Sequence, residues 1–117
     1  MAFKFENLKV WQKSLDLTEQ IDLLTKTFPS NEKYVLVDQI RRAGDSISLN
    51  IAEGSTNQSN AEFKRFLTYS IRSNIEVVGC LHLGKRRKII TISDFDKIYN
   101  ECEQIHAMLI ALKNSIQ

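Results

Sequence analysis

A heptad pattern of apolar residues near the carboxyl-terminal end constrains the fold of this chain more than any other feature. Seven apolar residues are spaced 3, 4, 3, 4, 3 and 4 apart: Phe95, Ile98, Cys102, Ile105, Leu109, Leu112 and Ile116. An uninterrupted stripe of this kind is typical of a helix that packs in a bundle or a coiled coil. Ser93, with Asp96 three residues later, predicts the start of this helix through a capping-box arrangement.

Three further helices are predicted upstream. The first runs from about residue 8 to residue 26, and the dipeptide Phe28-Pro29 ends it. The second is predicted to end at Gly54, as at a C-cap glycine. Its apolar stripe is Leu36, Ile40, Ala43, Ile47 and Ile51. The third opens at a capping box formed by Ser59 and Glu62. Its apolar face is Phe63, Phe66, Leu67, Ile71, Ile75, Val78 and Leu81.

The connections between these helices determine the predicted topology. Short links at residues 28–31 and 55–58, and a longer link at residues 84–92, favour antiparallel neighbours. Four Gly and one Pro in 117 residues are too few for a many-turned β-sandwich or barrel. Ile89, Ile90 and Ile92 have no partner strand, so we interpret them as a loop packed on the bundle end. The prediction is an all-α, antiparallel up-down-up-down four-helix bundle in one domain, residues 1–117.

Nothing in the sequence suggests export or insertion into a membrane. The longest uncharged stretch is nine residues, 104–112, whereas a membrane span needs about 20. The amino-terminal residues contain no apolar signal core. Cys80 and Cys102 are therefore interpreted as reduced core residues of a cytoplasmic protein that has no membrane partner.

The first helix carries more apolar residues than a bundle requires. One stripe consists of Val10, Leu17, Ile21, Leu24 and Phe28. Leu8, Trp11 and Leu15 project from nearly the opposite side. A helix in a four-helix bundle needs a single apolar face, so we interpret the second face as an interface between copies of the chain. The alternative is that Trp11 caps the end of the bundle.

A polar stripe flanks the apolar stripe of the second helix. Its members, within an arc of about 80°, are Gln39, Arg42, Ser46, Asn50 and Glu53. Amide, hydroxyl and charged groups at the edge of a core can hydrogen-bond one another and fix the register of helices. The stripe is therefore predicted to be structural and not to contact a substrate.

The same segment resembles a known family. The run from Tyr34 to Ala43 (YVLVDQIRRA) and the run from Asn50 to Gly54 (NIAEG) are similar to the signature of the 23S rRNA-intervening-sequence protein family. Further matching residues are Phe5, Leu8, Val10, Trp11, Phe28, Pro29, Ser46, Ile47, Phe63, Phe66, Leu67, Ser73 and Glu76. The resemblance covers nearly the whole chain, and the basic segment at residues 85–88 departs from it.

The resemblance implies a bacterial four-helix bundle that assembles into a ring of five subunits, a homopentamer. A related accessory protein of diversity-generating retroelements forms the same kind of ring, binds nucleic acid and works with a reverse transcriptase. The implied partners are further copies of the chain, RNA or DNA, and a reverse transcriptase where the gene context has one. The resemblance implies no particular reaction.

Basic residues concentrate in the middle of the chain. Residues 41–92 hold nine basic and four acidic groups, although the net charge of the whole chain is only +2. The predicted nucleic-acid contacts are Lys85, Arg86, Arg87, Lys88, Arg65 and Arg72. The affinity that phosphate contacts provide adds up across the copies in an oligomer. Such contacts do not depend on the base sequence of the nucleic acid. The basic run has no interleaved aromatic residue, which gives little support for base stacking. The alternative is a solvated loop that keeps the protein soluble.

Patterns typical of metal binding and catalysis are weak or absent. Cys102 and His106 share one helix face, but Cys80 and His82 point away from each other, so a four-ligand site is not formed. The Glu-x-x-His pattern of di-iron bundles occurs once, at Glu103, and that fold needs it twice. The sequence has no glycine-rich phosphate loop and no Gly-x-Ser-x-Gly elbow. We predict no metal, no cofactor and no enzymatic activity. A nucleic-acid-binding oligomer and an oligomeric scaffold without such a ligand both remain open.

Overall fold

Four α-helices and two short 3-10 helices make up the described part of the chain, residues 2–56 and 59–117 of the computed structural model. In chain order they are η1 (Lys4–Asn7), α1 (Lys9–Thr25), η2 (Ser30–Glu32), α2 (Leu36–Gly54), α3 (Asn60–Arg86) and α4 (Ile92–Ser115). The described residues contain no strand. The predicted all-α four-helix bundle is therefore confirmed.

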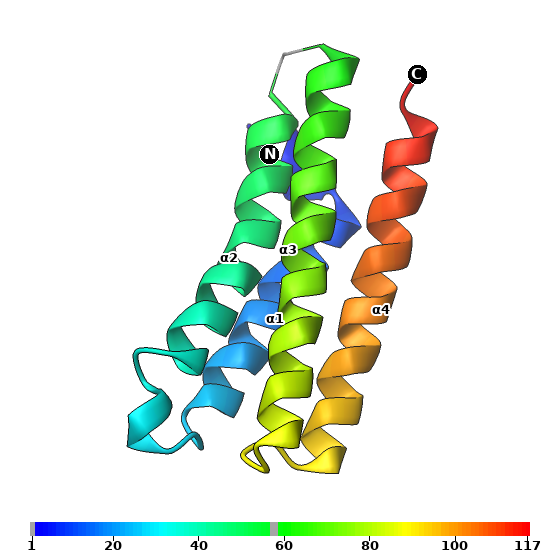
Figure 1. Cartoon of the computed structure of the whole chain (residues 1–117). Helices are drawn as coiled ribbons and strands as arrows, with labels where there is room; N and C mark the ends of the chain where they lie inside the picture. The colour runs from blue at the N-terminus through cyan, green and yellow to red at the C-terminus, as the bar shows by residue number, and fades with distance from the viewer. Residues whose placement is uncertain (1, 57–58) are drawn as a thin grey trace.

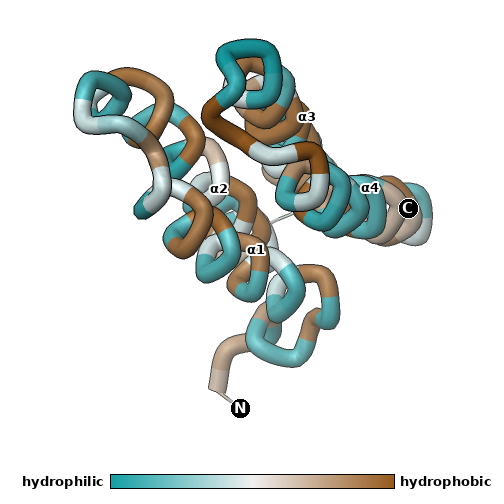
Figure 2. The backbone as a smooth tube through the Cα atoms, turned by 90° about the horizontal axis from the view of Figure 1, so that it is seen from below, coloured by the Kyte–Doolittle hydropathy of each residue, from teal (hydrophilic) through white to brown (hydrophobic). Residues whose placement is uncertain are grey.

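Consecutive helices run antiparallel along a body of 43 × 22 × 22 Å (Figure 1). The contact between α2 and α3 is the most extensive, and α4 packs against α3 and, less extensively, against α1. Seen along the helices, α1 and α2 lie on one side and α3 and α4 on the other (Figure 2). The connection between α3 and α4, part of which is strongly hydrophobic, lies at the end of the bundle that faces the viewer in that figure.

The predicted apolar stripes form the core. The stripe of α2 is buried along its whole length, and that of α4 is buried from Phe95 to Leu109. On α1 the buried stripe is the one that contains Leu17, Ile21 and Leu24. The prediction for α3 was wrong at one position, because 56% of Ile75 is exposed.

Two predicted helix caps differ from the structure. Gly54 is the last residue of α2 and has no positive φ. A Cβ atom on Gly54 would lie 2.5 Å from Cβ of Phe66, so this glycine allows α3 to approach α2 closely and is not a C-cap. The N-cap of α4 is Thr91, whose hydroxyl accepts a hydrogen bond from the Asp94 amide at 3.1 Å. The predicted cap, Ser93, lies inside the helix.

The predicted long link at residues 84–92 is shorter than expected. Helix α3 continues to Arg86 and α4 begins at Ile92. Ile90 is buried against Gly84, as predicted for a segment packed on the bundle end, whereas Ile92 is exposed on α4. The predicted short link at residues 28–31 is longer in the structure, where residues 26–35, including η2, join α1 to α2. In the predicted link 55–58, residues 57–58 lie outside the described residues.

Both cysteines are free and buried. Across residues 2–56 and 59–117, every helix is too short or too polar to traverse a lipid bilayer.

Candidate nucleic-acid interface

Four consecutive basic residues, Lys85–Lys88, lie where α3 ends; we call them the basic cluster. Lys85 and Arg86 belong to the last turn of α3, and Arg87 is its C-cap. Lys88 has a φ of 63°, in the left-handed region that lets the chain turn towards α4. The cluster is therefore the end of a helix and not the loop predicted from the sequence. Cations at a helix carboxyl end also stabilise the helix dipole.

An open groove of about 540 Å³ adjoins this end of α3. It is lined by His82, Leu83, Lys85, Arg86 and Lys88. Within the described part of the chain, neither Arg86 nor Lys88 forms an ion pair, and both side chains are exposed. Three cations that converge on one open groove suit a polyanionic ligand better than a small neutral one.

Two members of the basic cluster also have partners inside the protein. The Lys85 ammonium lies 4.4 Å from the centre of the Phe95 ring, within the range of a cation–π interaction. Arg87 donates to the Glu32 carboxylate at 3.2 Å and thereby ties the end of α3 to η2. These contacts hold Lys85 and Arg87 against the protein, whereas Arg86 and Lys88 have no such partner among the described residues.

The structure places aromatic rings beside the basic cluster that the sequence pattern did not reveal. The His82 ring meets the Phe95 ring edge-on, with 5.0 Å between the ring centres. The Phe95 and Tyr99 rings stack, with 5.4 Å between their centres. Phe95 is buried and Tyr99 is half-buried, so neither is free to stack on a base. The sequence predicted a longer link at residues 84–92, so it is the structure, in which only residues 87–91 join α3 to α4, that places Phe95 here.

The other two predicted contacts do not join this site. Arg65 lies twenty residues before Lys85 on α3, which is a distance of about 30 Å along the helix. Its guanidinium pairs with Glu62 at 2.7 Å. Arg72 lies on the exposed side of the middle of α3. The structure therefore separates the six predicted residues into a basic cluster and two isolated arginines.

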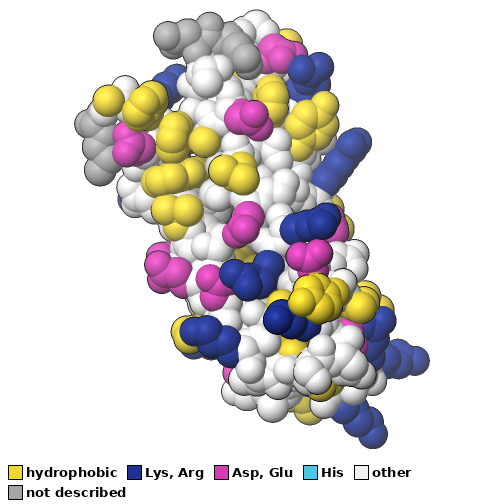
Figure 3. Space-filling view, turned by 90° about the vertical axis from the view of Figure 1, so that its left-hand side faces the viewer, with side chains coloured by type: hydrophobic (Ala, Val, Ile, Leu, Met, Phe, Trp, Pro, Cys, Tyr) yellow, Lys and Arg dark blue, Asp and Glu magenta, His cyan; other side chains and the backbone are white. Residues whose placement is uncertain are grey.

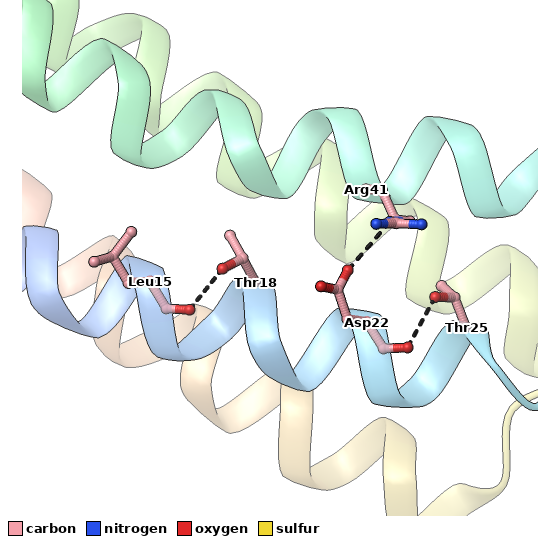
Figure 4. Close-up of polar contacts among 5 residues, drawn as sticks. All are labelled: Leu15, Thr18, Asp22, Thr25 and Arg41. Atoms are coloured by element: carbon pink, nitrogen blue, oxygen red, sulfur yellow. Dashed lines mark hydrogen bonds and ion pairs between the residues drawn. The ribbon is translucent and has the colours of Figure 1, made fainter.

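The predicted oligomer interface lies near the opposite end of the bundle. Leu8 and Trp11 are half-buried and pack against the core, and the Trp11 ring meets Phe5 edge-on at 4.9 Å. Leu15 is 37% exposed and lies on the same side of α1 as Thr18 and Asp22, beside α2 (Figure 4). Asp22 pairs with Arg41 of α2 at 3.1 Å.

Hydrophobic side chains gather on the upper part of the molecular face that Figure 3 shows. Charged side chains of both signs occupy the middle and lower part of that face, with Lys and Arg at its lower edge. Some charged side chains also lie among the hydrophobic ones in the upper part, and a smaller hydrophobic group lies in the lower part (Figure 3).

The polar stripe of α2 divides into two parts. Gln39, Ser46 and Asn50 lie along the contact with α3 and form what we call the α2–α3 seam. The hydroxyls of Ser46 and Ser73 are 2.9 Å apart, and the Asn50 amide donates to the Ser46 carbonyl at 2.8 Å. Arg42 and Glu53 are exposed, and among the described residues Arg42 pairs only with Asp38 of its own helix, at 3.4 Å.

Two further hydrogen bonds extend the α2–α3 seam. The Ser70 hydroxyl, which is fully buried, donates to the Ile47 carbonyl at 2.9 Å. The Gln39 amide donates to the Glu76 carboxylate at 3.5 Å. The seam therefore joins α2 to α3 through bonds between side chains and to the backbone.

The cysteines lack the features of metal ligands or nucleophiles. Burial, with a smaller effect from Glu76, raises the pKa of Cys80 to about 11, although Arg87 acts in the opposite direction. Burial, with a smaller effect from Glu101, raises the pKa of Cys102 to about 12. Both thiols are therefore protonated near neutral pH. In the described part of the chain, no three His, Cys, Asp or Glu side chains are grouped to share a metal ion.

Comparisons with known proteins place this bundle among similar chains. A family model described as 23S rRNA-intervening sequence protein matches residues 6–111. A crystal structure of a protein with unknown function, from the S23 ribosomal protein family of Bacteroides thetaiotaomicron VPI-5482, is similar with a TM-score of 0.82 and 30% identity. The similarity covers 90% of this chain and 95% of that one. A search of curated proteins finds no match.

Proposed function

Because the chain belongs to the 23S rRNA-intervening sequence protein family, we propose that it is a non-enzymatic, homo-oligomeric accessory protein that binds nucleic acid without sequence preference. The observation that carries this proposal is the groove beside the basic cluster, where Lys85, Arg86 and Lys88 converge. Proteins that contact mainly the phosphate backbone gain affinity from such cations and read little sequence.

Assembly into an oligomer would increase the affinity for nucleic acid further. Each copy in a closed ring contributes one basic cluster, and the contacts to one strand then add. The proposed interface consists of Leu8, Trp11 and Leu15. We propose a pentamer in the cytoplasm, with a reverse transcriptase as a further partner where the gene context has one.

A second candidate function is an oligomeric scaffold with no nucleic-acid ligand. It is favoured by the contacts of Lys85 with Phe95 and of Arg87 with Glu32. These contacts, and the dipole of α3, give the basic cluster a structural role that needs no ligand.

Binding measurements on matched variants separate the two functions. Arg86→Gln with Lys88→Gln removes the two cations of the basic cluster that have neither an ion pair nor a cation–π contact among the described residues. Lys4→Gln with Lys9→Gln removes the same charge at the opposite end of the bundle and serves as the control. Fluorescence anisotropy would measure the affinity for single-stranded and duplex RNA and DNA from about 50 to about 200 mM salt.

If the protein binds nucleic acid, the variant with Arg86→Gln and Lys88→Gln should bind more weakly than the wild type. The loss of affinity should be similar for all sequences. On duplex DNA, the slope of log affinity against log salt falls by about 0.9 for each phosphate that the variant no longer neutralises. The control variant keeps the wild-type slope and differs little in affinity. Failure of the wild-type protein to bind any of these ligands at low salt contradicts the proposal and favours the scaffold.

Assembly is tested independently by light scattering. Leu15→Glu introduces a charge at the proposed interface, and Leu23→Glu makes the same change at a more exposed position of the same helix. We expect a mass several times 13.5 kDa for the wild type and for Leu23→Glu, and a smaller mass for Leu15→Glu. A wild-type monomer at micromolar concentration would contradict assembly.

A further inference from the structure

One residue in the groove beside the basic cluster belongs to the type that changes its charge near neutral pH. The groove of about 540 Å³ is lined by His82 as well as by Lys85, Arg86 and Lys88. His82 is exposed, so a ligand in the groove can reach its imidazole. Histidine is the side chain that ordinarily gains a proton between pH 8 and pH 5, whereas lysine and arginine stay charged throughout that range.

Contacts with Phe95 hold His82 close to Lys85. The imidazole meets the Phe95 ring edge-on, with 5.0 Å between the ring centres, and the Lys85 ammonium lies 4.4 Å from the centre of the same ring. Lys85 and Arg86 follow His82 by three and four residues on α3, a spacing that places side chains on one face of a helix. The imidazole and the cations therefore face one ligand.

The groups that surround His82 supply no anionic partner. Besides the three cations of the groove, Tyr99 of α4 faces it, with 6.3 Å between the ring centres. Two carboxylates of α4 lie within four residues of Tyr99, and both are exposed: Asp96 and Glu103. Among the described residues, neither of them, nor any other carboxylate, forms an ion pair with His82.

On the basis of the proposed function, we propose that His82 contacts a phosphate of the bound nucleic acid in its protonated form, so that binding takes up a proton. The proton comes from the solvent and adds to the free ring nitrogen of the imidazole. A nearby phosphate favours the charged imidazole, because opposite charges attract and a charged donor forms the stronger hydrogen bond. Coupling of this kind is reciprocal, so the protein binds nucleic acid more tightly at pH 6 than at pH 8.

Affinities at two pH values test this coupling. The probe is a rhodamine-labelled duplex RNA with hydroxyl ends, in which every phosphate is a diester and keeps its charge from pH 6 to pH 8. Each proton taken up changes the affinity by at most about tenfold per pH unit. At constant salt, we expect the wild-type protein to bind this RNA at least about threefold more tightly at pH 6 than at pH 8.

Three variants assign the pH dependence to one histidine. His82→Gln carries no charge and should bind equally at both pH values. His82→Lys carries a permanent charge and should bind at pH 8 about as tightly as the wild type does at pH 6. His106→Gln is the matched control, because His106 is the other histidine of the chain and is also exposed. It lines a separate groove of about 280 Å³ between α3 and α4, which we call the α3–α4 groove, and His106→Gln should keep the wild-type pH dependence.

Calorimetry counts the proton directly. Isothermal titration of the protein with the unlabelled RNA at pH 7, in two buffers with different heats of ionisation, gives the number of protons that binding takes up. We expect net uptake for the wild type and for His106→Gln, and none for His82→Gln.

The outcomes separate this proposal from the proposed function. Equal wild-type affinity at pH 6 and pH 8, or a pH dependence that persists in His82→Gln, would overturn the role of His82 and leave nucleic-acid binding intact. Absence of binding to the RNA at both pH values and at low salt would overturn both.

Discussion

Helix α3 contacts its two neighbours in different ways. On the α2 side, the hydroxyls of Ser46, Ser70 and Ser73 form hydrogen bonds at 2.9 Å, and Gly54 allows Phe66 to lie against the backbone of α2. On the α4 side, a single Asn74 amide reaches the Cys102 carbonyl and leaves its own oxygen without a partner. A groove of about 280 Å³ remains there.

The difference shows how side-chain size affects the two contacts of one helix. Small residues bring α2 and α3 close enough for their polar groups to bond one another. Larger residues beside Asn74, such as Ile75 and Tyr99, line an opening, and the buried Oδ1 of Asn74 has no hydrogen-bond partner among the described residues. We therefore expect the loss of a polar group in the α2–α3 seam to lower stability more than the loss of Asn74 on the α4 side.

The largest effect is expected at Gly54. A Cβ atom there would lie 2.5 Å from Cβ of Phe66 and 3.2 Å from Cδ1 of Phe63. Gly54→Ala forces the helices apart and should lower the free energy of unfolding by about 1–3 kcal/mol. Urea denaturation measures this change.

Gly79 supplies the matched control in the middle of α3. A Cβ atom on Gly79 would meet nothing within 4 Å. Gly79→Ala should raise the free energy of unfolding by about 0.5–1 kcal/mol, because alanine is the better helix former. If Gly54→Ala were as stable as the wild type, the close approach of α2 and α3 would not require glycine.

A smaller effect is expected from single polar groups on the two sides of α3. Ser70→Ala removes the buried bond to the Ile47 carbonyl and should cost about 0.5–1.5 kcal/mol. Asn74→Leu removes a bond to Cys102 but also an unpartnered acceptor, so its stability should stay close to that of the wild type. Thermal denaturation of both variants checks which one loses more stability. A larger loss of stability in Asn74→Leu than in Ser70→Ala would contradict the difference between the two sides of α3.

At neutral pH the smallest effect is expected from the cysteine thiols. Cys80 lies near Glu76, and Cys102 lines the α3–α4 groove. Burial raises both thiol pKa values above the ordinary 9.0, to about 11 and about 12. The protonated thiols therefore contribute stability that is complete below pH 9 and is lost as the pH rises through 11 and 12.

Urea denaturation at a series of pH values measures this contribution. The wild type should lose stability above pH 9 more steeply than the variant with Cys80→Ala and Cys102→Ala. Identical pH profiles above pH 9 would show that the thiols ionise as easily in the folded state as in the unfolded chain.

Much of the fold could be predicted from the spacing of apolar residues, because helix packing requires a continuous stripe. The ends of helices were harder to predict. Thr91 and Ser93 are both good N-cap residues, and burial of Ile90 against Gly84 decides between them. Gly54 was mistaken for a C-cap because its role depends on Phe66, which lies on another helix.

The candidate sites were only partly visible in the sequence. A run of basic residues is local and was therefore found, whereas its contacts with Glu32 and Phe95 come from distant segments. Asn74 was missed, although it continues the 4, 3, 4, 3 spacing of the predicted apolar-face residues Leu67, Ile71, Val78 and Leu81 of α3. An amide inside an apolar stripe was the available signal for the α3–α4 groove.

Hydrogen–deuterium exchange with mass spectrometry, in the presence and absence of duplex RNA, tests the central claim most directly. The claim is that the basic cluster binds the polyanion and that the α2–α3 seam is structural. We predict slower exchange for peptides from residues 82–90 when RNA is added, and unchanged exchange for peptides from residues 46–54. Unchanged exchange at residues 82–90, or protection centred on residues 46–54, would contradict the account.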